Sequence, residues 1–265
     1  MGQYTTDYLR YAWQMLNGFC ASNELAIADR RQKNITPYLD GGRPWRVLDL
    51  GNGRLRPQYM LLKAAGHRVY GIDLINQSGP SSVDVAYRVA RWLYRWKLGL
   101  PAETAAGRTL VCADVCALPF PDNSFDLATS VAAFEHFLNV PTVVAELYRV
   151  LRPGGLVWVV IHLFTSLSGG HNLSATEIPL RGVPTSVDPW DHLRKRRLPV
   201  RAPLNEWRRD QYLETFFRSF EIVKHECGTR EGQELLTPVL EAELSNYSRD
   251  ELTCRSYIIL ARKVA

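Results

Sequence analysis

The stretch "VLDLGNGRLRP", residues 47–57, decides the fold. Its short apolar run carries Asp49 near the end, and glycines follow at positions 51 and 53. Glycine allows a tight turn and a close approach of the backbone to a ligand, and Pro57 suits the first position of a helix. The free N–H groups of such a helix point at whatever lies against the turn. The stretch therefore predicts a strand, a ligand-binding turn and a helix.

The segments that follow repeat this alternation of strand and helix. The helical segment "QYMLLKAAG" stops at Gly66, and the next strand, "HRVYGID", ends on Asp73. Later strands are predicted at "TLVCAD", which ends at Asp114, and at "FDLATSVAAF", "LVWVVIHL", "SFEIVKHE" and "RSYIILARK". Helices are predicted over residues 83–98, 142–151, 205–217 and 232–244. This order is typical of an α/β fold with a doubly wound, mainly parallel sheet.

The domain organisation is predicted from breaks in that rhythm. Residues 5–39 show helical spacing, with Asn23 and Glu24 able to start a second helix, so residues 1–44 are expected to form an N-terminal helical cap. Residues 45–265 are expected to form one domain. Within it, residues 164–204 are rich in Gly, Ser, Pro, Arg and His and are expected to form a substrate-side insert.

Composition limits the class of protein. The chain has 265 residues and no continuous apolar stretch long enough for a membrane-spanning helix or a signal peptide, so we expect a cytoplasmic protein. Its five cysteines suggest neither a disulfide framework nor a zinc cluster, and no metal site is expected. The net charge of +5 comes partly from the basic clusters 87–97 and 191–197, which could meet phosphates, an acidic substrate or a membrane surface, or simply face solvent.

Two features of the first turn indicate the kind of cofactor. In dinucleotide-binding proteins a third glycine follows the second by three residues, but here that position is Arg56, which disfavours an NAD-dependent oxidoreductase. The carboxylate of Asp49 would repel a pyrophosphate but could order a ligand with an ammonium or sulfonium group, which favours S-adenosylmethionine. Asp73 is spaced to bind the two ribose hydroxyls, and Asp114 can accept a hydrogen bond from the adenine amino group.

At this point the chain resembles the class I S-adenosylmethionine-dependent methyltransferases, and within them the methyltransferase type 11 domain. The matching pieces are "VLDLGNG", "VYGIDL", "ADVCALPFPDNSFD", "EHFLNVPTVVAELYRVLRPGGLVWVVI" and "RSYIILARK", in the correct order. Members of the family commonly have "GCGTG" where this chain has "GNGRL", so Arg54 and Leu55 are departures. The resemblance implies a Rossmann-like sheet of seven strands in the order 3-2-1-4-5-7-6, with strand 7 antiparallel.

The resemblance also implies the residues of the cofactor site. Gly51, Asn52 and Gly53 would lie against the methionine part together with Asp49, and Asp73 would bind the ribose. Asp114 would meet the adenine, with Val115 and Cys116 flanking its ring. The remaining residues expected in this site are Leu74, Ser130 and Val131.

Three histidines are candidates for acid–base chemistry or substrate contact. His162 ends the fifth predicted strand, at the edge where open α/β sheets bind ligands. His136 belongs to a Glu-His pair after the fourth strand, and His171 lies in the insert. Each of them could instead be a structural histidine. The aromatic and basic helix 83–98 could be a covering helix, a lid over the cofactor or a nucleic-acid surface.

The leading hypothesis is an enzyme that methylates a small or medium-sized metabolite by in-line transfer, leaving S-adenosylhomocysteine, with oxygen as the expected acceptor atom and nitrogen as the alternative. An RNA methyltransferase and a non-catalytic cofactor-binding protein of the same fold are the alternatives. The expected partner is a small-molecule substrate, with no membrane and no nucleic acid, and the sequence is compatible with a homodimer.

Overall fold

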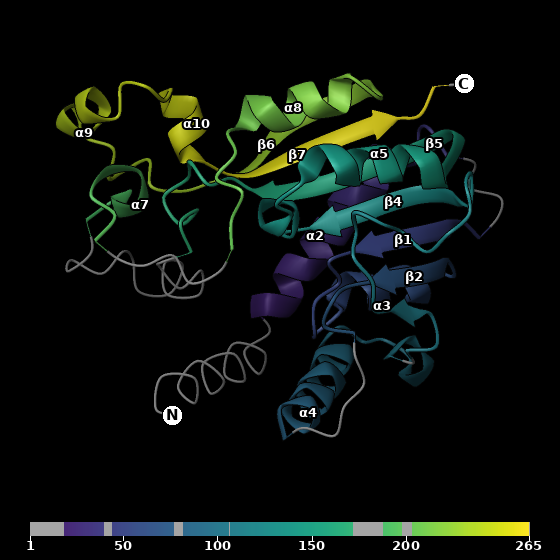
Figure 1. Ribbon diagram of the computed structural model, residues 1–265. Helices are drawn as coiled ribbons and strands as arrows, with labels where there is room; N and C mark the ends of the chain where they lie inside the picture. The colour runs from purple at the N-terminus through teal and green to yellow at the C-terminus, as the bar shows by residue number, and fades with distance from the viewer. Residues whose placement is uncertain are drawn as a thin grey trace. The chain divides into compact units, whose positions relative to one another are not determined.

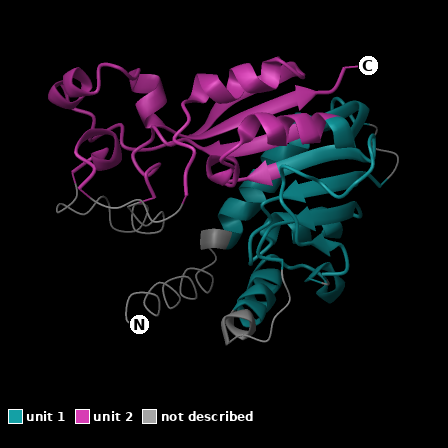
Figure 2. Ribbon diagram, in the orientation of Figure 1, with its two compact units in different colours: residues 1–129, 149–156 teal, residues 130–148, 157–265 magenta. Residues whose placement is uncertain are grey.

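The computed structural model describes residues 19–39, 44–76, 82–105, 107–171, 188–197 and 203–264. The expected helical segment before residue 19 lies outside these residues. The chain divides into two compact units, and each is taken by itself below (Figure 2). The first contains residues up to 129 together with 149–156, and the second contains residues 130–148 together with 157–265.

The backbone of the fold is a seven-stranded sheet in the order β3-β2-β1-β4-β5-β7-β6 (Figure 1). Its strands are β1 (Arg46–Leu50), β2 (Arg68–Ile72), β3 (Leu110–Val111), β4 (Phe125–Val131), β5 (Leu151–His162), β6 (Glu221–Arg230) and β7 (Cys254–Arg262). β2 pairs in parallel with both β1 and β3, whereas β6 and β7 are antiparallel. The predicted order and the antiparallel last strand are confirmed.

In the first unit, α3 (Pro57–Ala64) lies between the sheet and the other helices. α3 lies against β2 and also contacts α2 (Phe19–Ile35) and α4 (Ser82–Lys97). A short 3₁₀ helix, η1 (Ala102–Ala105), contacts both α3 and α4. α2 runs through Asn23 without interruption, so the expected new helix start at that residue is wrong.

The third strand is shorter than the sequence predicts. It ends at Val111, three residues before Asp114. The carboxylate of Asp114 accepts the Cys116 N–H at 2.8 Å, and its carbonyl accepts the Ala117 N–H at 3.1 Å, so the chain already turns there. Asp114 therefore lies in the turn after the strand and is exposed.

α4 separates its aromatic residues into a buried and an exposed set. Tyr94 is buried at 5% exposure, whereas Trp92 and Trp96 are 55% and 59% exposed. The Arg91 side chain donates to the Arg54 carbonyl at 2.7 Å, which ties this helix to the glycine loop. Its contacts with α3 and η1 support the prediction of a covering helix.

The second unit contains β6, β7 and most of the remaining helices. α8 (Arg209–Phe217) lies against β6 and β7 (Figure 1). The other helices are η2 (Phe134–His136), α5 (Val140–Val150), α7 (Asp191–Arg194), α9 (Pro238–Glu243) and α10 (Arg249–Thr253). The helical stretch predicted over residues 232–244 is shorter in the structure, and α10, which is capped by the Ser248 hydroxyl, was not predicted.

Trp190 is the centre of a second, smaller core that the insert forms with the chain after β6. Its side chain is fully buried, and its indole N–H donates to the Leu252 carbonyl at 3.2 Å. The buried members of this cluster are Leu167, Trp190, Leu236, Leu244 and Leu252. The described parts of the insert, residues 164–171 and 188–197, thus help to build an apolar lobe.

Candidate functional site

The glycine loop leads from β1 to α3 and is hydrogen-bonded to the end of β2. Gly51 and Gly53 both have a φ of 63°, in the left-handed region that glycine tolerates. Gly51 donates to the Ile72 carbonyl at 2.8 Å, and Gly53 donates to the Asp73 carboxylate at 2.9 Å. The loop is therefore held by the acidic residue that was predicted to bind ribose.

Asn76 is a residue of this loop region that sequence reasoning missed. Its amide donates to the Asn52 side chain and to the Val111 carbonyl, each at 3.0 Å. The Asn52 amide in turn donates to the Gly53 carbonyl at 2.9 Å. These bonds connect the glycine loop to the ends of β2 and β3. A polar residue three positions after a strand-end aspartate was the only available signal for this role.

Arg56, the residue at the third glycine position, has a left-handed backbone with a φ of 58°. It immediately precedes Pro57, which is the first residue of α3, as predicted. Burial, and to a smaller extent the neighbouring Arg91, lowers the pKa of its guanidinium to about 10. The loop thus keeps a backbone shape that glycine favours while it carries a cationic side chain.

Asp73 and Asp114 keep acceptor capacity for a ligand. Besides the bond from Gly53, Asp73 accepts the Ile75 N–H at 3.1 Å. Each carboxylate oxygen has two lone pairs, so Asp73 can still accept hydroxyl groups. Leu74 is 65% exposed beside it. Asp114 is exposed, and the Val115 and Cys116 that follow it are half-buried.

Asp49 differs from these two acids because it is buried, at 3% exposure. Burial raises its pKa to about 7, while the cation of Arg31 on α2 opposes that shift and Glu24 and Asp73 add to it. Arg31 donates to the Gln58 side chain at 2.7 Å, and Gln58 donates to Glu24 at 2.6 Å. Asp49 therefore lies beneath the loop, in a charged network with α2.

The candidate residues of the second unit lie at the ends of β4 and β5. Ser130 is fully buried and Val131 is half-buried, both in β4. Glu135 follows in η2 and is 2% exposed. Among the described residues, neither of its carboxylate oxygens has a hydrogen-bond partner. Burial raises the pKa of Glu135 to about 8. Its own N–H and that of His162 face the carboxylate and lower the pKa by less, but neither reaches hydrogen-bond geometry.

The structure brings the three predicted histidines together. The His171 Nε2 lies 3.2 Å from the His162 Nδ1. The His136 and His171 rings meet edge to face with centroids 5.0 Å apart. The His136 Nδ1 lies 2.8 Å from the Pro203 carbonyl, to which it must donate because a carbonyl oxygen only accepts.

Ser168 and Glu231 determine which nitrogen of His162 carries the proton. The Ser168 hydroxyl and backbone N–H both donate to one oxygen of Glu231, at 2.7 and 2.8 Å. With its proton used in that way, the hydroxyl oxygen can only accept from the His162 Nε2, which lies 2.9 Å away. His162 is therefore protonated at Nε2, and its Nδ1 presents a lone pair toward His171.

Both central imidazoles are held in the neutral form. Burial lowers the pKa of His162 well below its usual value, and the neighbouring His171 and Arg255 lower it further. Burial also lowers the pKa of His171 to about 4, with further contributions from His136, His192 and Arg255. Neutral imidazoles can accept a proton or bind a cation.

The loop between these histidines is tightly packed. A Cβ atom at Gly169 would clash with the Leu163 carbonyl, and one at Gly170 would clash with the His192 ring. Residues 163–170 are buried throughout. The two glycines thus allow the chain to fold back so that His171 returns to His162.

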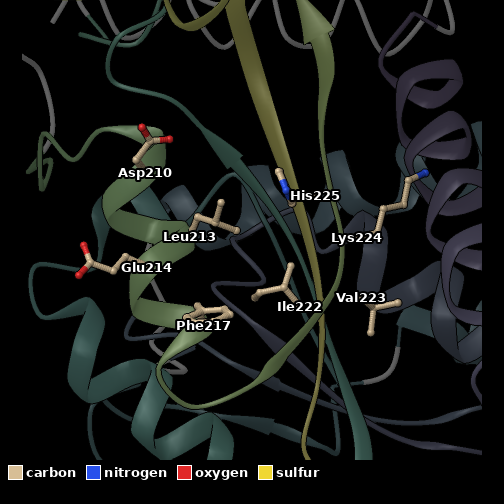
Figure 3. Close-up of a pocket in the computed structure, with 8 residues that line it drawn as sticks. All are labelled: Asp210, Leu213, Glu214, Phe217, Ile222, Val223, Lys224 and His225. Carbon is tan, nitrogen blue, oxygen red and sulfur yellow. The ribbon is translucent and has the colours of Figure 1, made fainter.

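A separate hollow lies between α8 and β6 in the second unit. It has a volume of about 660 Å³, and its lining includes Leu213, Phe217, Ile222 and His225 (Figure 3). The candidate residues discussed above are not among its lining residues. We therefore do not assign a role in the reaction to this hollow.

The basic segment of the insert is largely neutralised. Arg194 pairs with Glu243, and Arg196 pairs with Glu206 at 2.8 Å. Lys195 and Arg197 both pair with Asp188, at 2.8 and 3.5 Å. These ion pairs weaken the interpretation of this segment as a nucleic-acid surface. None of the described helices is sufficiently long and apolar to cross a membrane.

The fold and the glycine loop place this chain in the class of Rossmann-like proteins that bind an adenosyl cofactor. Residues 48–159 match the family model of the methyltransferase domain. The chain thus contains a methyltransferase domain over these residues, which is consistent with the predicted class I S-adenosylmethionine-dependent methyltransferase.

Two curated relatives and one solved structure illustrate the similarity. The sterol 24-C-methyltransferase ERG6B of Gibberella zeae is 32% identical over 182 residues, which cover 66% of this chain and 44% of that protein. The malonyl-[acyl-carrier protein] O-methyltransferase of Halorhodospira halophila is 34% identical over 132 residues, which cover 49% and 39%. The chain therefore spans less than half of either relative.

The structure of phosphoethanolamine N-methyltransferase 2 from Haemonchus contortus, in complex with S-adenosyl-L-methionine, shares the fold. It has a TM-score of 0.56 and 20% sequence identity, and the match covers all of this chain and 59% of that one.

Proposed function

We propose that the protein transfers a methyl group from S-adenosylmethionine to an oxygen atom of a small or medium-sized organic acceptor, in line, and leaves S-adenosylhomocysteine. The observation that carries the proposal is the bond from the Gly53 N–H to the Asp73 carboxylate. It holds the loop and the ribose acid together, as an adenosyl ligand would require. Asp114 would then bind the adenine, and the loop residues Gly51 and Asn52 would lie against the methionine part.

The acceptor side of the proposal is assigned to the second unit. In-line displacement depends mainly on holding the nucleophile, the methyl carbon and the sulfur in a line, which can contribute on the order of 7 to 11 kcal/mol. A hydroxyl acceptor also benefits from a base, by roughly 10²- to 10⁴-fold. His162, with its proton fixed on Nε2, offers the Nδ1 lone pair for that role, and His171 and His136 would contact the acceptor.

The names of the relatives include methylation at carbon and at oxygen. The choice of oxygen therefore rests on the histidines, because a hydroxyl group must lose its proton when the methyl group is transferred.

The proposal is tested first by calorimetry of the full chain with S-adenosylmethionine and, in parallel, with NAD. We expect binding of the first and none of the second. A radiolabelled methyl donor is then supplied with a collection of hydroxyl, amine and carbon acceptors. Label should appear on a hydroxyl compound, and label on an amine or a carbon instead would overturn the acceptor assignment.

A variant separates donor binding from methyl transfer. His162→Ala should leave the affinity for S-adenosylmethionine unchanged and lower the turnover, because the histidine is assigned to the acceptor side. Equal turnover in the variant and the wild type would return His162 to a structural role.

A further inference from the structure

We propose that Glu135, His162 and His171 form a binding site for one divalent transition-metal ion. Each residue offers one ligand atom, and the three atoms lie within 4.8 Å of one another. All three residues belong to the second unit. Two imidazoles and one carboxylate are the donor set of several catalytic zinc sites and of non-haem iron sites.

The strongest observation is the state of Glu135. Its carboxyl group is almost completely buried, at 2% exposure, and within the described chain both of its oxygens are without a hydrogen-bond donor. A buried polar group without a partner is costly, whereas a buried carboxylate that binds a metal ion is a common arrangement. A cation between Glu135 and the two histidines would supply the missing partner.

The histidine geometry fits an ion of this kind. Metal–ligand bonds of about 2.0 to 2.2 Å place neighbouring ligand atoms roughly 3 to 3.4 Å apart. The His162 Nδ1 and the His171 Nε2 are already 3.2 Å apart. The widest separation that the three atoms can have is 4.8 Å, and a shift of about 1.4 Å in one side chain brings it into the same range.

The neighbours of His162 are those of a metal ligand. A metal-binding histidine almost always donates its other ring N–H to a carboxylate, a carbonyl or a water molecule. Here the Nε2–H donates to Ser168, and Ser168 donates to Glu231. Glu231 also faces Arg255 at 3.6 Å. This series of hydrogen bonds keeps the Nδ1 lone pair of His162 directed at the proposed ion.

The backbone that presents His171 is determined by its surroundings. His171 has a φ of 50°, which is uncommon for a residue with a side chain, and such conformations persist where neighbours fix them. Its N–H donates to the Ser168 carbonyl at 3.1 Å, and Gly169 and Gly170 leave no room for a side chain. The backbone position of His171 is therefore fixed by its neighbours.

The proposed metal site differs from the sequence analysis, in which no metal site was expected. Its ligands come from η2, the end of β5 and the insert, so no short motif announces it. Three protein ligands leave a coordination position open. This consequence rests on the proposed function: with the ion bound, the Nδ1 lone pair of His162 would coordinate the ion instead of acting as the base, and an acceptor oxygen at the open position would be polarised and would release its proton to water more easily.

The test uses the full chain, freed of metal with a chelator and titrated with ZnSO₄ and CoCl₂ in the absence of donor and acceptor. We expect one ion per chain. Glu135→Gln and His171→Gln should each weaken binding by at least roughly tenfold. His225→Gln, the same change at an exposed histidine, should leave binding unchanged. Absence of binding by the wild type at about 0.1 mM metal, or equal affinity in all variants, would overturn the proposal.

The absorption spectrum of bound cobalt also distinguishes binding at this site from binding at cysteine thiolates. Cys227 and Cys254 interact with each other on the paired strands β6 and β7 and are the alternative ligands. Thiolates are soft ligands that give cobalt an intense charge-transfer band, which imidazole and carboxylate ligands do not give. The wild-type spectrum should lack that band, and its presence would overturn the proposal even if the variants failed to fold.

The outcome is separable from the proposed function, because no methyl donor is used. Metal binding without methyl transfer would leave this site standing while the proposed function fails. Methyl transfer by a protein shown to bind no metal would overturn the metal site and leave the proposed function standing.

Discussion

Among single residues, Asp73 is the one whose replacement we expect to weaken donor binding most. Its carboxylate holds the Gly53 N–H at 2.9 Å and is assigned to the ribose hydroxyls. Hydrogen bonds to a charged acceptor are roughly twice as strong as neutral ones. We expect Asp73→Ala to weaken S-adenosylmethionine binding by more than about tenfold in calorimetry. Asp29→Ala, at an exposed aspartate of α2, is the control, and an affinity within twofold in both variants would refute the ribose assignment.

Asp49 gives donor binding a pH dependence. Its pKa is raised to about 7 by burial, so part of the population is neutral near pH 7. A cationic donor favours the ionised form, so its binding should release a proton and become tighter as the pH rises. For a single group of this pKa, the affinity at pH 8 should exceed that at pH 6 by roughly tenfold.

The control for this prediction is Asp49→Asn, because the amino group of the donor titrates equally in both proteins. The difference between the two pH profiles belongs to Asp49. Arg31, Glu24 and Asp73 are the charged groups that influence it, and all three stay in the variant. Parallel profiles for the two proteins would show that the Asp49 carboxyl group does not couple to the donor.

At the scale of the element, the lobe around Trp190 depends on one large side chain. Trp190 is fully buried, whereas Trp92 on α4 is 55% exposed. Removal of a buried tryptophan side chain costs about 3 to 5 kcal/mol, through lost burial and the cavity that remains. We expect Trp190→Ala to lower the free energy of unfolding by that amount in urea, and Trp92→Ala to change it by about 0.5 kcal/mol or less. Equal effects would show that the lobe is not packed around Trp190.

The elements that the sequence predicted well are those with a long or strongly marked pattern. β1 is buried over four of its five residues, and α3 begins at Pro57, the residue that was predicted to take the first helical position. The errors occur where local hydrogen bonds decide the structure. β3 ends at Val111, before a turn in which the Asp114 carboxylate accepts the Cys116 N–H, and the Ser248 hydroxyl caps the start of α10. Neither feature changes the hydrophobic pattern.

At the scale of the whole molecule, the two units differ in how far the sequence reveals their chemistry. The residues proposed to bind the donor, Gly51, Gly53 and Asp73, are close in the chain and follow a motif, so they could be predicted before the structure. The sequence supplied the three histidines as separate candidates. It did not reveal that Glu135 joins two of them, or that Glu231 orients His162 through Ser168, because these contacts join distant segments.

The ion pairs of residues 194–197 weaken the alternative of an RNA acceptor. The formal net charge is +5, but the cations of residues 194–197 all pair with carboxylates. We therefore expect no binding to a fluorescent RNA tighter than about 10⁻⁵ M at physiological salt. Binding that is tighter than this and falls steeply as salt rises would favour an RNA substrate.

The most direct test of the account is a crystal structure of the protein with S-adenosylhomocysteine. The account predicts that the ribose hydroxyls lie within hydrogen-bond distance of the Asp73 carboxylate, with the adenine at Asp114 and the amino acid part against Gly51 and Gly53. A nucleoside bound elsewhere on the molecule, with the glycine loop empty, would contradict it.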